Sequence, residues 1–359
     1  MIRILAAGIV LVLGAADGLP HASFPPPNSI LLDAKHKEPK NGVEQEGNTI
    51  SIRSGVGTPT TINVLSFSRD AKLLAAGKDF GRVVVWDVPR RTVLCALSTG
   101  QGIVAAIAIS PDDQFVATAG SSGDAEIKLW HLPDGKFVRL FKIGHPAVQR
   151  LVFGIDSSLI VAENNAVTSV LDIASARHTQ DLPGEWAPTL SIDGTALITV
   201  SSTEVVLRRA GDWGEQKRFP KPTMYAYPLS FDTHSDVFIY GDSTSDPSFI
   251  ALRLSEGETL SKPGTAKLPR LNLSTGYFVS LKPKSDLAFG HSGGRLWLWG
   301  VQTGMTCVSE VLYSESGALS ADGSLLAGGI DSSFFAKDKI EPGVGLWQTE
   351  ALRNACGVH

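Results

Sequence analysis

The stretch that decides the fold is Val64-Leu-Ser-Phe-Ser-Arg-Asp-Ala-Lys-Leu-Leu-Ala-Ala-Gly-Lys-Asp-Phe-Gly-Arg-Val-Val-Val-Trp-Asp87. It places two apolar segments on either side of a polar turn, and a third apolar segment ends in Trp86. The segment from Ile107 to Trp130 repeats this order about 40 residues later. A fixed period of this length is typical of repeat folds, in which each unit buries its apolar faces against its neighbours.

Seven units can be counted when each is anchored on the turn between its first two strands. The steps between the last residues of successive anchors are 42, 44, 37, 41, 50 and 38 residues. Asp, Ser, Pro and Gly recur in these anchors because they favour turns through side-chain hydrogen bonds or a preset backbone angle. The anchors are Ser68-Arg-Asp70, Ser110-Pro-Asp112, Gly154-Ile-Asp156, Ser191-Ile-Asp193, Asp232-Thr-His234, Lys282-Pro-Lys284 and Ser320-Ala-Asp322.

The most distinctive feature of the repeat is the residue that ends the third strand of each unit. This strand ends in Trp in four units, at Trp86, Trp130, Trp299 and Trp347, and the matching residues elsewhere are Leu171, Arg208 and Leu254. With this pattern the chain resembles the WD-repeat family of β-propellers over residues 48–359, and Trp86-Asp87 and Gly144-His145 match its two signature dipeptides. The resemblance implies an all-β fold, a seven-bladed β-propeller of four-stranded antiparallel blades.

The family stabilises its blades with a hydrogen-bonded set of Asp, His, Ser or Thr, and Trp. None of the units has this set intact: Trp86 has Asp79 but no His, and His145 precedes a unit with Leu171 in place of Trp. We therefore expect blade stability to come mostly from apolar packing between blades.

Closure of the ring needs a strand from one end of the chain, because an open ring would leave two strand edges unpaired. Thr49-Ile-Ser-Ile-Arg-Ser-Gly55 precedes the first full unit and is the favoured candidate for completing the last blade. The alternative is Ala351-Leu-Arg-Asn-Ala-Cys356, whose distance from Trp347 matches that of Cys95 from Trp86.

The N-terminus predicts export. Met1-Ile2-Arg3 is followed by an apolar run from Ile4 to Gly14 and by small residues, which indicates a signal peptide over residues 1–16. Residues 17–47 contain three consecutive prolines and a polar stretch, and are predicted to form a linker or arm before the propeller at 48–359. The expected location is secreted or periplasmic, with no membrane span in the mature chain.

The amino-acid composition limits the classes of binding partner that we expect. The net charge of -4 and the pI near 6.1 lack the basic excess of nucleic-acid-binding proteins, so no nucleic acid is expected. Cys95, Cys307 and Cys356 are predicted to lie on outer strands of different blades, too far apart for a disulfide, and three free thiols are the favoured prediction.

The sequence predicts no catalytic, metal or cofactor site. Gly290-His-Ser-Gly-Gly294 matches the nucleophile elbow of serine hydrolases, but it lies between two predicted strands of a hairpin rather than on a strand-to-helix turn. The eight histidines form no spacing that is typical of metal ligands, so each is interpreted as a surface or structural residue.

Two features predict a binding surface. By analogy with WD-repeat propellers, the turns between second and third strands share a rim with the turns that open each unit. This rim would gather Lys78, Arg82, His145, Trp186, His291 and Arg295. The last unit also has a long insertion at 331–343, where Phe334 and Phe335 either cover the seam of the ring or meet a partner.

The favoured function is an exported, non-enzymatic, monomeric scaffold for protein-protein interaction, because propellers present varied loops on a rigid rim. One alternative is a propeller enzyme of the lactonase-like or metal-dependent hydrolase type, with carboxylates and histidines meeting at the central channel. The other is a small-ligand or glycan-binding propeller, with Trp186, Trp213 and Trp297 as stacking platforms.

Overall fold

The computed structural model describes most of the chain from residue 61 onward and three short segments before it. The described residues are 29–32, 43–46, 49–52, 61–121, 126–143, 148–156, 158–163, 167–222, 227–241, 249–256, 258–261, 278–282, 285–292, 295–308, 316–330 and 343–357. The predicted signal peptide lies outside these residues.

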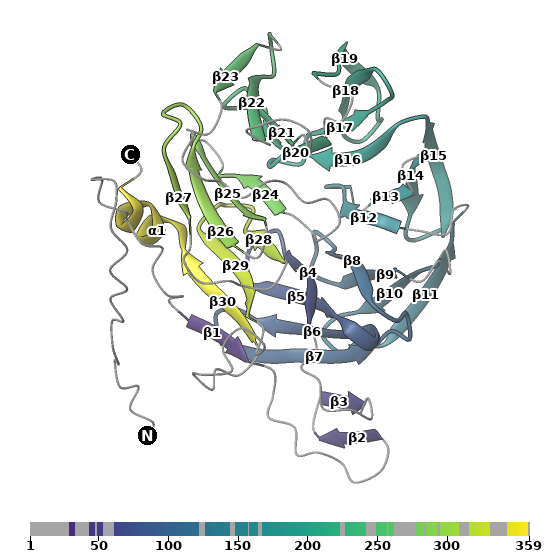
Figure 1. Cartoon of the computed structure of the whole chain (residues 1–359). Helices are drawn as coiled ribbons and strands as arrows, with labels where there is room; N and C mark the ends of the chain where they lie inside the picture. Colours follow the sequence, from purple (N-terminus) through teal and green to yellow (C-terminus); the bar gives the residue numbers. More distant parts are fainter. Residues whose placement is uncertain are drawn as a thin grey trace.

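The described strands form seven four-stranded antiparallel sheets, arranged around a common axis, and one separate two-stranded hairpin (Figure 1). We number the sheets as blades in chain order and give the innermost strand first. Blade 1 consists of β4 (Ile62–Phe67), β5 (Leu73–Lys78), β6 (Arg82–Asp87) and β7 (Thr92–Ser98), with the short helix η1 (Asp79–Gly81) between β5 and β6. Blade 2 consists of β8 (Val104–Ile109), β9 (Phe115–Gly120), β10 (Glu126–His131) and β11 (Phe137–Lys142).

Blades 3 to 5 follow the same meander. Blade 3 consists of β12 (Val148–Phe153), β13 (Ser158–Glu163), β14 (Val167–Asp172) and β15 (Arg177–Pro183). Blade 4 consists of β16 (Trp186–Leu190), β17 (Ala196–Val200), β18 (Glu204–Arg209) and β19 (Glu215–Pro220). Blade 5 consists of β20 (Tyr227–Asp232), β21 (Val237–Gly241), β22 (Phe249–Arg253) and β23 (Thr259–Ser261).

The last two blades end the ring. Blade 6 consists of β24 (Phe278–Leu281), β25 (Leu287–Ser292), β26 (Arg295–Gly300) and β27 (Thr306–Val308). Blade 7 takes β28 (Gly317–Leu319), β29 (Leu325–Ile330) and β30 (Gly343–Gln348) from the end of the chain and β1 (Ser29–Leu32) from its beginning. Helix α1 (Thr349–Cys356) follows β30, and β2 (Val43–Glu46) and β3 (Thr49–Ile52) form the separate hairpin.

The innermost strands contact one another in succession around the axis, from β4 through β8, β12, β16, β20 and β24 to β28, and β28 contacts β4 again. Blades 1 and 7 also share an apolar cluster in which Leu65 and Trp86 pack with Ala318 and Val344. The ring is therefore closed. The predicted all-β propeller of four-stranded antiparallel blades is confirmed.

The apolar runs of the second strands follow from this stacking. All five residues of β17 and all five of β21 are buried, because a middle strand is covered by a neighbouring blade on each face. Outer strands such as β15 and β19 are mostly exposed and polar. The core is therefore a set of apolar layers between blades, as the sequence analysis predicts.

The predicted Ser-x-Asp anchors form one recurrent turn. In four blades the Ser hydroxyl donates to the Asp Oδ1 two residues later and accepts the backbone N–H five residues later. The hydroxyl-to-carboxylate distances are 2.9 Å for Ser68, 2.6 Å for Ser110, 2.6 Å for Ser191 and 2.6 Å for Ser320. These turns lie after the innermost strands, and we call this side of the ring the turn face.

The strand-ending tryptophans fill the layers between blades. Trp86, Trp299 and Trp347 are fully buried, and Trp130 is nearly so. Each occupies the same register position, opposite the second residue of the preceding strand, as in the Leu74↔Trp86 pair. In blade 5 this position belongs to Leu252, which pairs with Phe238, so the assignment of Leu254 to it is corrected.

In the part of the chain that the structure describes, blades 2 and 4 have hydrogen-bonded sets with altered chemistry. In blade 2, Trp130 Nε1 donates to Thr118 Oγ1 at 3.0 Å, and Thr118 Oγ1 donates to Gln101 Oε1 at 2.7 Å. In blade 4, Arg208 replaces the Trp and pairs with the buried Glu185, which also accepts the Thr199 hydroxyl. A buried charge is tolerated only when it is paired and hydrogen-bonded, and both conditions are met here.

The closing strand differs from the prediction. The outer strand of blade 7 is β1, which pairs with β30 from Ser29↔Leu346 to Leu32↔Gly343. The prediction that Thr49 to Gly55 closes the ring is wrong, because β3 pairs with β2 and lies against β7 of blade 1. A strand from the N-terminal part of the chain does complete blade 7, as predicted. That strand comes from residues 17–47, the segment that was predicted to be a linker or arm.

The C-terminal segment also differs from its alternative prediction as an outer strand. Residues 349–356 form helix α1, which ends at Gly357 in the left-handed conformation and packs Leu352 and Cys356 onto blade 6. There Cys356 forms a disulfide with Cys307 of β27, with a Cα–Cα distance of 5.8 Å. The prediction of three free thiols is therefore wrong for this pair, because the helix brings Cys356 back onto the neighbouring blade. Cys95 is free and buried, and burial raises its pKa to about 12.

Shortening the chain tests the role of β1. Removal of residues 1–34 eliminates β1, and we expect the free energy of unfolding to fall by about 2–4 kcal/mol because several edge hydrogen bonds are lost. Removal of residues 1–28 keeps β1 and serves as the control. Urea unfolding followed by tryptophan fluorescence measures both, and equal stability of the two truncated chains would contradict the assignment.

Loss of the disulfide tests the attachment of α1. Cys356→Ser is expected to lower the free energy of unfolding by about 2–4 kcal/mol, since the bond closes a long loop. A reductant should destabilise the natural chain by a similar amount and leave Cys356→Ser unchanged. Alkylation of three thiols in the unreduced, unfolded chain would show that the bond is absent.

Candidate functional site

The side opposite the turn face carries η1 and the connections between blades, and we call it the loop face. The sequence predicts binding residues on this side. Lys78 ends β5 but is only 1% exposed, so it is part of the core. Arg82 and Arg295 begin the third strands of blades 1 and 6, and both are half-buried.

Other predicted binding residues are only partly described. Trp186 begins β16 and is half-buried, and Lys221 Nζ lies 5.3 Å from the centre of its ring. The backbone of His291 belongs to β25, which forms a hairpin with β26, as predicted for the Gly290 to Gly294 motif. His145, Phe334 and Phe335 lie outside the described residues. The predicted residues whose side chains the structure describes therefore belong to blades 1, 4 and 6.

Two exposed apolar residues on the loop face were not predicted. Phe80 of η1 is 55% exposed, and Ile103, just before β8, is 46% exposed. Gly81 N donates to Gly102 O, and Thr99 N donates to Gly81 O at 2.7 Å, so the two loops are joined by their backbones. We call Phe80, Ile103 and the adjoining Arg82 the blade 1–2 patch.

The conformation of Phe80 is unusual. Its φ is 59° and its ψ is 27°, the left-handed region that bulky residues rarely adopt. Asp79 supports this turn, because its carboxylate accepts Thr61 N at 3.1 Å and Asn63 Nδ2 at 2.9 Å. An exposed aromatic residue held in an unfavourable conformation is a pointer to function.

The three tryptophans predicted as stacking platforms for a glycan differ in how deeply they are buried. Trp213 and Trp297 are buried in the layers between blades. Among the described residues, Trp186 alone of the three is half-buried, and it packs against the apolar cluster of blades 4 and 5. Trp213 and Trp297 therefore act as core residues.

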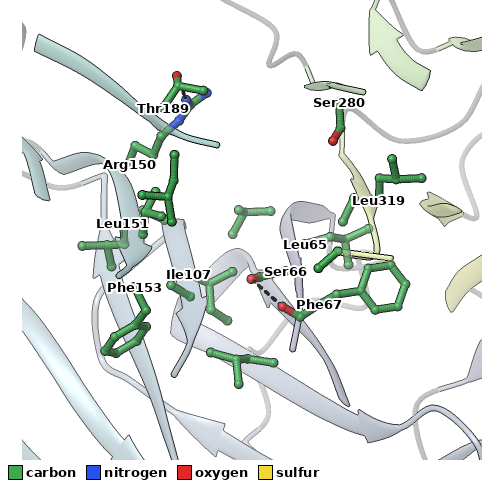
Figure 2. Close-up of a pocket in the computed structure, with 18 of the residues that line it drawn as sticks. Leu65, Ser66, Phe67, Ile107, Arg150, Leu151, Phe153, Thr189, Ser280 and Leu319 are labelled. Atoms are coloured by element: carbon green, nitrogen blue, oxygen red, sulfur yellow. Dashed lines mark hydrogen bonds between the residues drawn. The ribbon is translucent and has the colours of Figure 1, made fainter. Parts of the chain in front are cut away.

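The central channel is a second candidate site. It has a volume of about 960 Å³ and is lined by residues from the innermost strands of all seven blades. Figure 2 shows Arg150 and Thr189 together on one wall and Ser280 and Leu319 on the facing wall. Among the described residues that line it, the charged ones are Arg69 and Arg150. The described wall thus offers arginines, hydroxyls and apolar side chains.

The turn-face end of the channel is crossed by one side chain. Arg69 of blade 1 donates from Nη2 to Asp193 O of blade 4 at 2.9 Å, although these blades are not neighbours in the ring. Gly194 allows this approach, because a Cβ there would lie 2.6 Å from Ile155 Cγ2 and 3.1 Å from Arg69 Nη1. Arg69 therefore spans the mouth.

A carboxylate pair lies on the same face, between the turns of blades 1 and 2. Burial, together with the neighbouring charge of Asp70, raises the pKa of Asp113 to about 6. Asp113 also has a φ of 58°, and its Oδ1 is buried without a hydrogen-bond partner in the described part of the chain. The ionised form of Asp113 is therefore unfavourable in the folded protein.

The described residues include no group of three or more His, Cys, Asp or Glu side chains that could hold a metal ion. None of the helices in the described part of the chain is both long enough and apolar enough to cross a bilayer.

The closed ring of antiparallel blades defines a β-propeller. A model of the family described as "WD domain, G-beta repeat" matches residues 92–131, which run from β7 of blade 1 through β10 of blade 2. The matched unit therefore combines one outer strand with the first three strands of the next blade. The fold and the matched unit support the resemblance to a diverged WD-repeat β-propeller.

Curated relatives match parts of the chain. It is 26% identical over 31% of its length to cilia- and flagella-associated protein 52 of Macaca fascicularis. It is 25% identical over 47% to transducin beta-like protein 3 of Bos taurus, and 35% identical over 26% to WD repeat and SOCS box-containing protein 1 of Takifugu rubripes. The matches cover 18%, 22% and 22% of these relatives, so the chain spans about a fifth of each.

The Asp113 carboxylate predicts a specific pH dependence. Because its folded pKa is raised above its ordinary value, the contribution of Asp113 to stability falls as the pH rises through about 4 to 6. Asp113→Asn removes the charge and keeps a residue that tolerates positive φ. We expect it to raise the melting temperature at about pH 7.5 and to have little effect at about pH 4.

Asp112→Asn in the same turn is the control, because Asp112 accepts the Ser110 hydroxyl. It should lower the melting temperature at neutral pH. An equal shift for Asp113→Asn at both pH values would contradict the assigned cause.

Proposed function

We propose that this protein is a non-enzymatic propeller that acts as a protein-interaction scaffold, with the blade 1–2 patch as its contact surface. The observation that carries the proposal is Phe80, which is exposed and held at a φ of 59° by the surrounding turn. An L-residue of this size in the left-handed region costs about 1–2 kcal/mol. A partner that buries the ring would offset this cost.

The composition of the patch suits a protein partner. Phe80 and Ile103 offer apolar surface, and the half-buried Arg82 follows Phe80 by two residues in the chain. Aromatic and Arg side chains are enriched at the centres of protein interfaces. The partial matches to WD-repeat proteins also support an interaction scaffold, because propellers present varied loops on a rigid rim.

Export is part of the proposal. The Cys307–Cys356 disulfide supports it, because such bonds persist mainly in oxidising compartments. The apolar run at Ile4 to Gly14, predicted to belong to a signal peptide, supports it independently. A secreted or periplasmic location is consistent with both features.

Replacement of Phe80 separates its role in binding from its role in folding. Phe80→Asn should leave the free energy of unfolding unchanged or raise it by up to about 1 kcal/mol, because Asn tolerates the left-handed conformation. It should also remove partners that the natural chain captures by crosslinking in its host, as quantified by mass spectrometry.

Met305→Ser is the matched control, since Met305 is an exposed apolar residue in a turn of blade 6. Its captured partners should equal those of the natural chain. If Phe80→Asn also captures the same partners at the same level, the patch is not the contact surface.

A further inference from the structure

We propose that the central channel binds a small organic monocarboxylate, with Arg150 as the residue that recognises the carboxylate. This site is separate from the blade 1–2 patch and does not depend on the proposed scaffold function. The proposal rests on the contacts of Arg150, on the lining of the cavity and on the side from which the cavity is reached.

Arg150 is held in place by neutral oxygen atoms. It is the third residue of β12 and is half-buried in the channel wall. Its Nη1 donates to Pro188 O at 3.2 Å and to Thr189 Oγ1 at 2.8 Å. Both hydrogen bonds that this guanidinium donates to described residues come from Nη1. The edge formed by Nε and Nη2 remains for a ligand, and that pair of donors fits a carboxylate in bidentate fashion.

The charge of Arg150 favours an anion in the cavity. An arginine side chain stays protonated in proteins, and the carbonyl and hydroxyl groups that hold it carry no compensating charge. A half-buried charge without a counterion is unfavourable relative to a paired one. The other charged residue in the described lining, Arg69, is positive as well.

Charge balance selects a monocarboxylate. Arg69 is exposed at the turn-face mouth and bonded to Asp193 O, so Arg150 is the half-buried cation of the described channel wall. One guanidinium compensates one carboxylate, whereas a dianion such as phosphate would keep an uncompensated charge inside the cavity. A volume of about 960 Å³ is at the upper end of the range for small-molecule pockets.

The remaining wall suits an apolar body with a few polar groups. Leu65, Ile107 and Leu151 line the channel and offer apolar surface (Figure 2). Ser66 and Ser280 donate long bonds of 3.4 Å to the carbonyl groups of the next residues in their strands. These weak bonds are easily exchanged for bonds to a ligand.

A ligand would reach Arg150 from the loop face. Arg69 spans the turn-face mouth from blade 1 to blade 4, and Ile155 packs against Gly194 beneath it. The loop-face end is lined by residues at the start of the innermost strands, including Asn63 and Val148. Arg150 is two residues from that end of β12. A ligand that enters from the loop face would therefore meet Arg150 before it reaches Arg69.

Calorimetric titration of the full chain tests the proposal with hexanoate and 4-phenylbutyrate as probes. The amides of both acids and inorganic phosphate serve as comparison compounds. We expect at least one acid to bind the natural chain and both amides and phosphate to bind at least about tenfold more weakly, because a charge-assisted pair is lost or mismatched.

Variants locate the site. Arg150→Gln should weaken binding of the acid about tenfold or more, and Arg150→Lys should weaken it as well, since an ammonium group cannot form the bidentate pair. Arg139→Gln is the matched control, because Arg139 Nη1 also donates to two backbone oxygens, those of Ile173 and Ala174, outside the channel. It should bind the acid as the natural chain does.

Three results would overturn the proposal. The first is no binding of either acid to the natural chain at up to about 10 mM. The second is equal affinity for an acid and its amide. The third is equal loss of affinity in Arg150→Gln and Arg139→Gln. If Arg150→Gln fails to fold, the comparison of acid with amide on the natural chain still decides.

Discussion

Backbone pairing between β1 and β30 is the constraint on which the rest of the molecule depends. A propeller made from one end of the chain to the other would leave β30 as an edge and would free blades 1 and 7 to separate. Pairing of Ser29–Leu32 with β30 joins the two ends of the chain in one sheet. The apolar cluster between Trp86 of blade 1 and Val344 of blade 7 seals the seam from inside. The Cys307–Cys356 bond then fixes the segment after β30 to blade 6.

Closure also creates the two candidate sites. The channel exists because seven innermost strands surround one axis, and Arg69 can reach Asp193 only when blades 1 and 4 are held across that axis. The blade 1–2 patch exists because η1 and the loop before β8 meet on one face. The patch presents apolar surface outward, whereas the channel presents a guanidinium inward. The two surfaces therefore suit different ligands, a protein outside and a small anion inside.

The repeat and its blades could be predicted from the sequence because turns and strand-ending tryptophans follow local rules. The Ser-x-Asp hydrogen bonds show why: Ser110 and Asp112 need only each other and the next strand. The closing strand could not be predicted, since Ser29–Leu32 is short and its partner lies at the other end of the chain. The disulfide was missed because Cys356 lies on a helix rather than the expected strand. The exposed position of Phe80 was not predicted, because no sequence pattern indicates a positive φ at a bulky residue.

Hydrogen exchange at β1 tests ring closure most directly. In the full native chain, the amides of Ile30, Leu31 and Leu32 that face β30 should exchange far more slowly than those of an unfolded segment. Their protection should disappear together with that of β30 as urea is added. Exchange of these amides at unfolded rates, while β28 to β30 remain protected, would contradict the account.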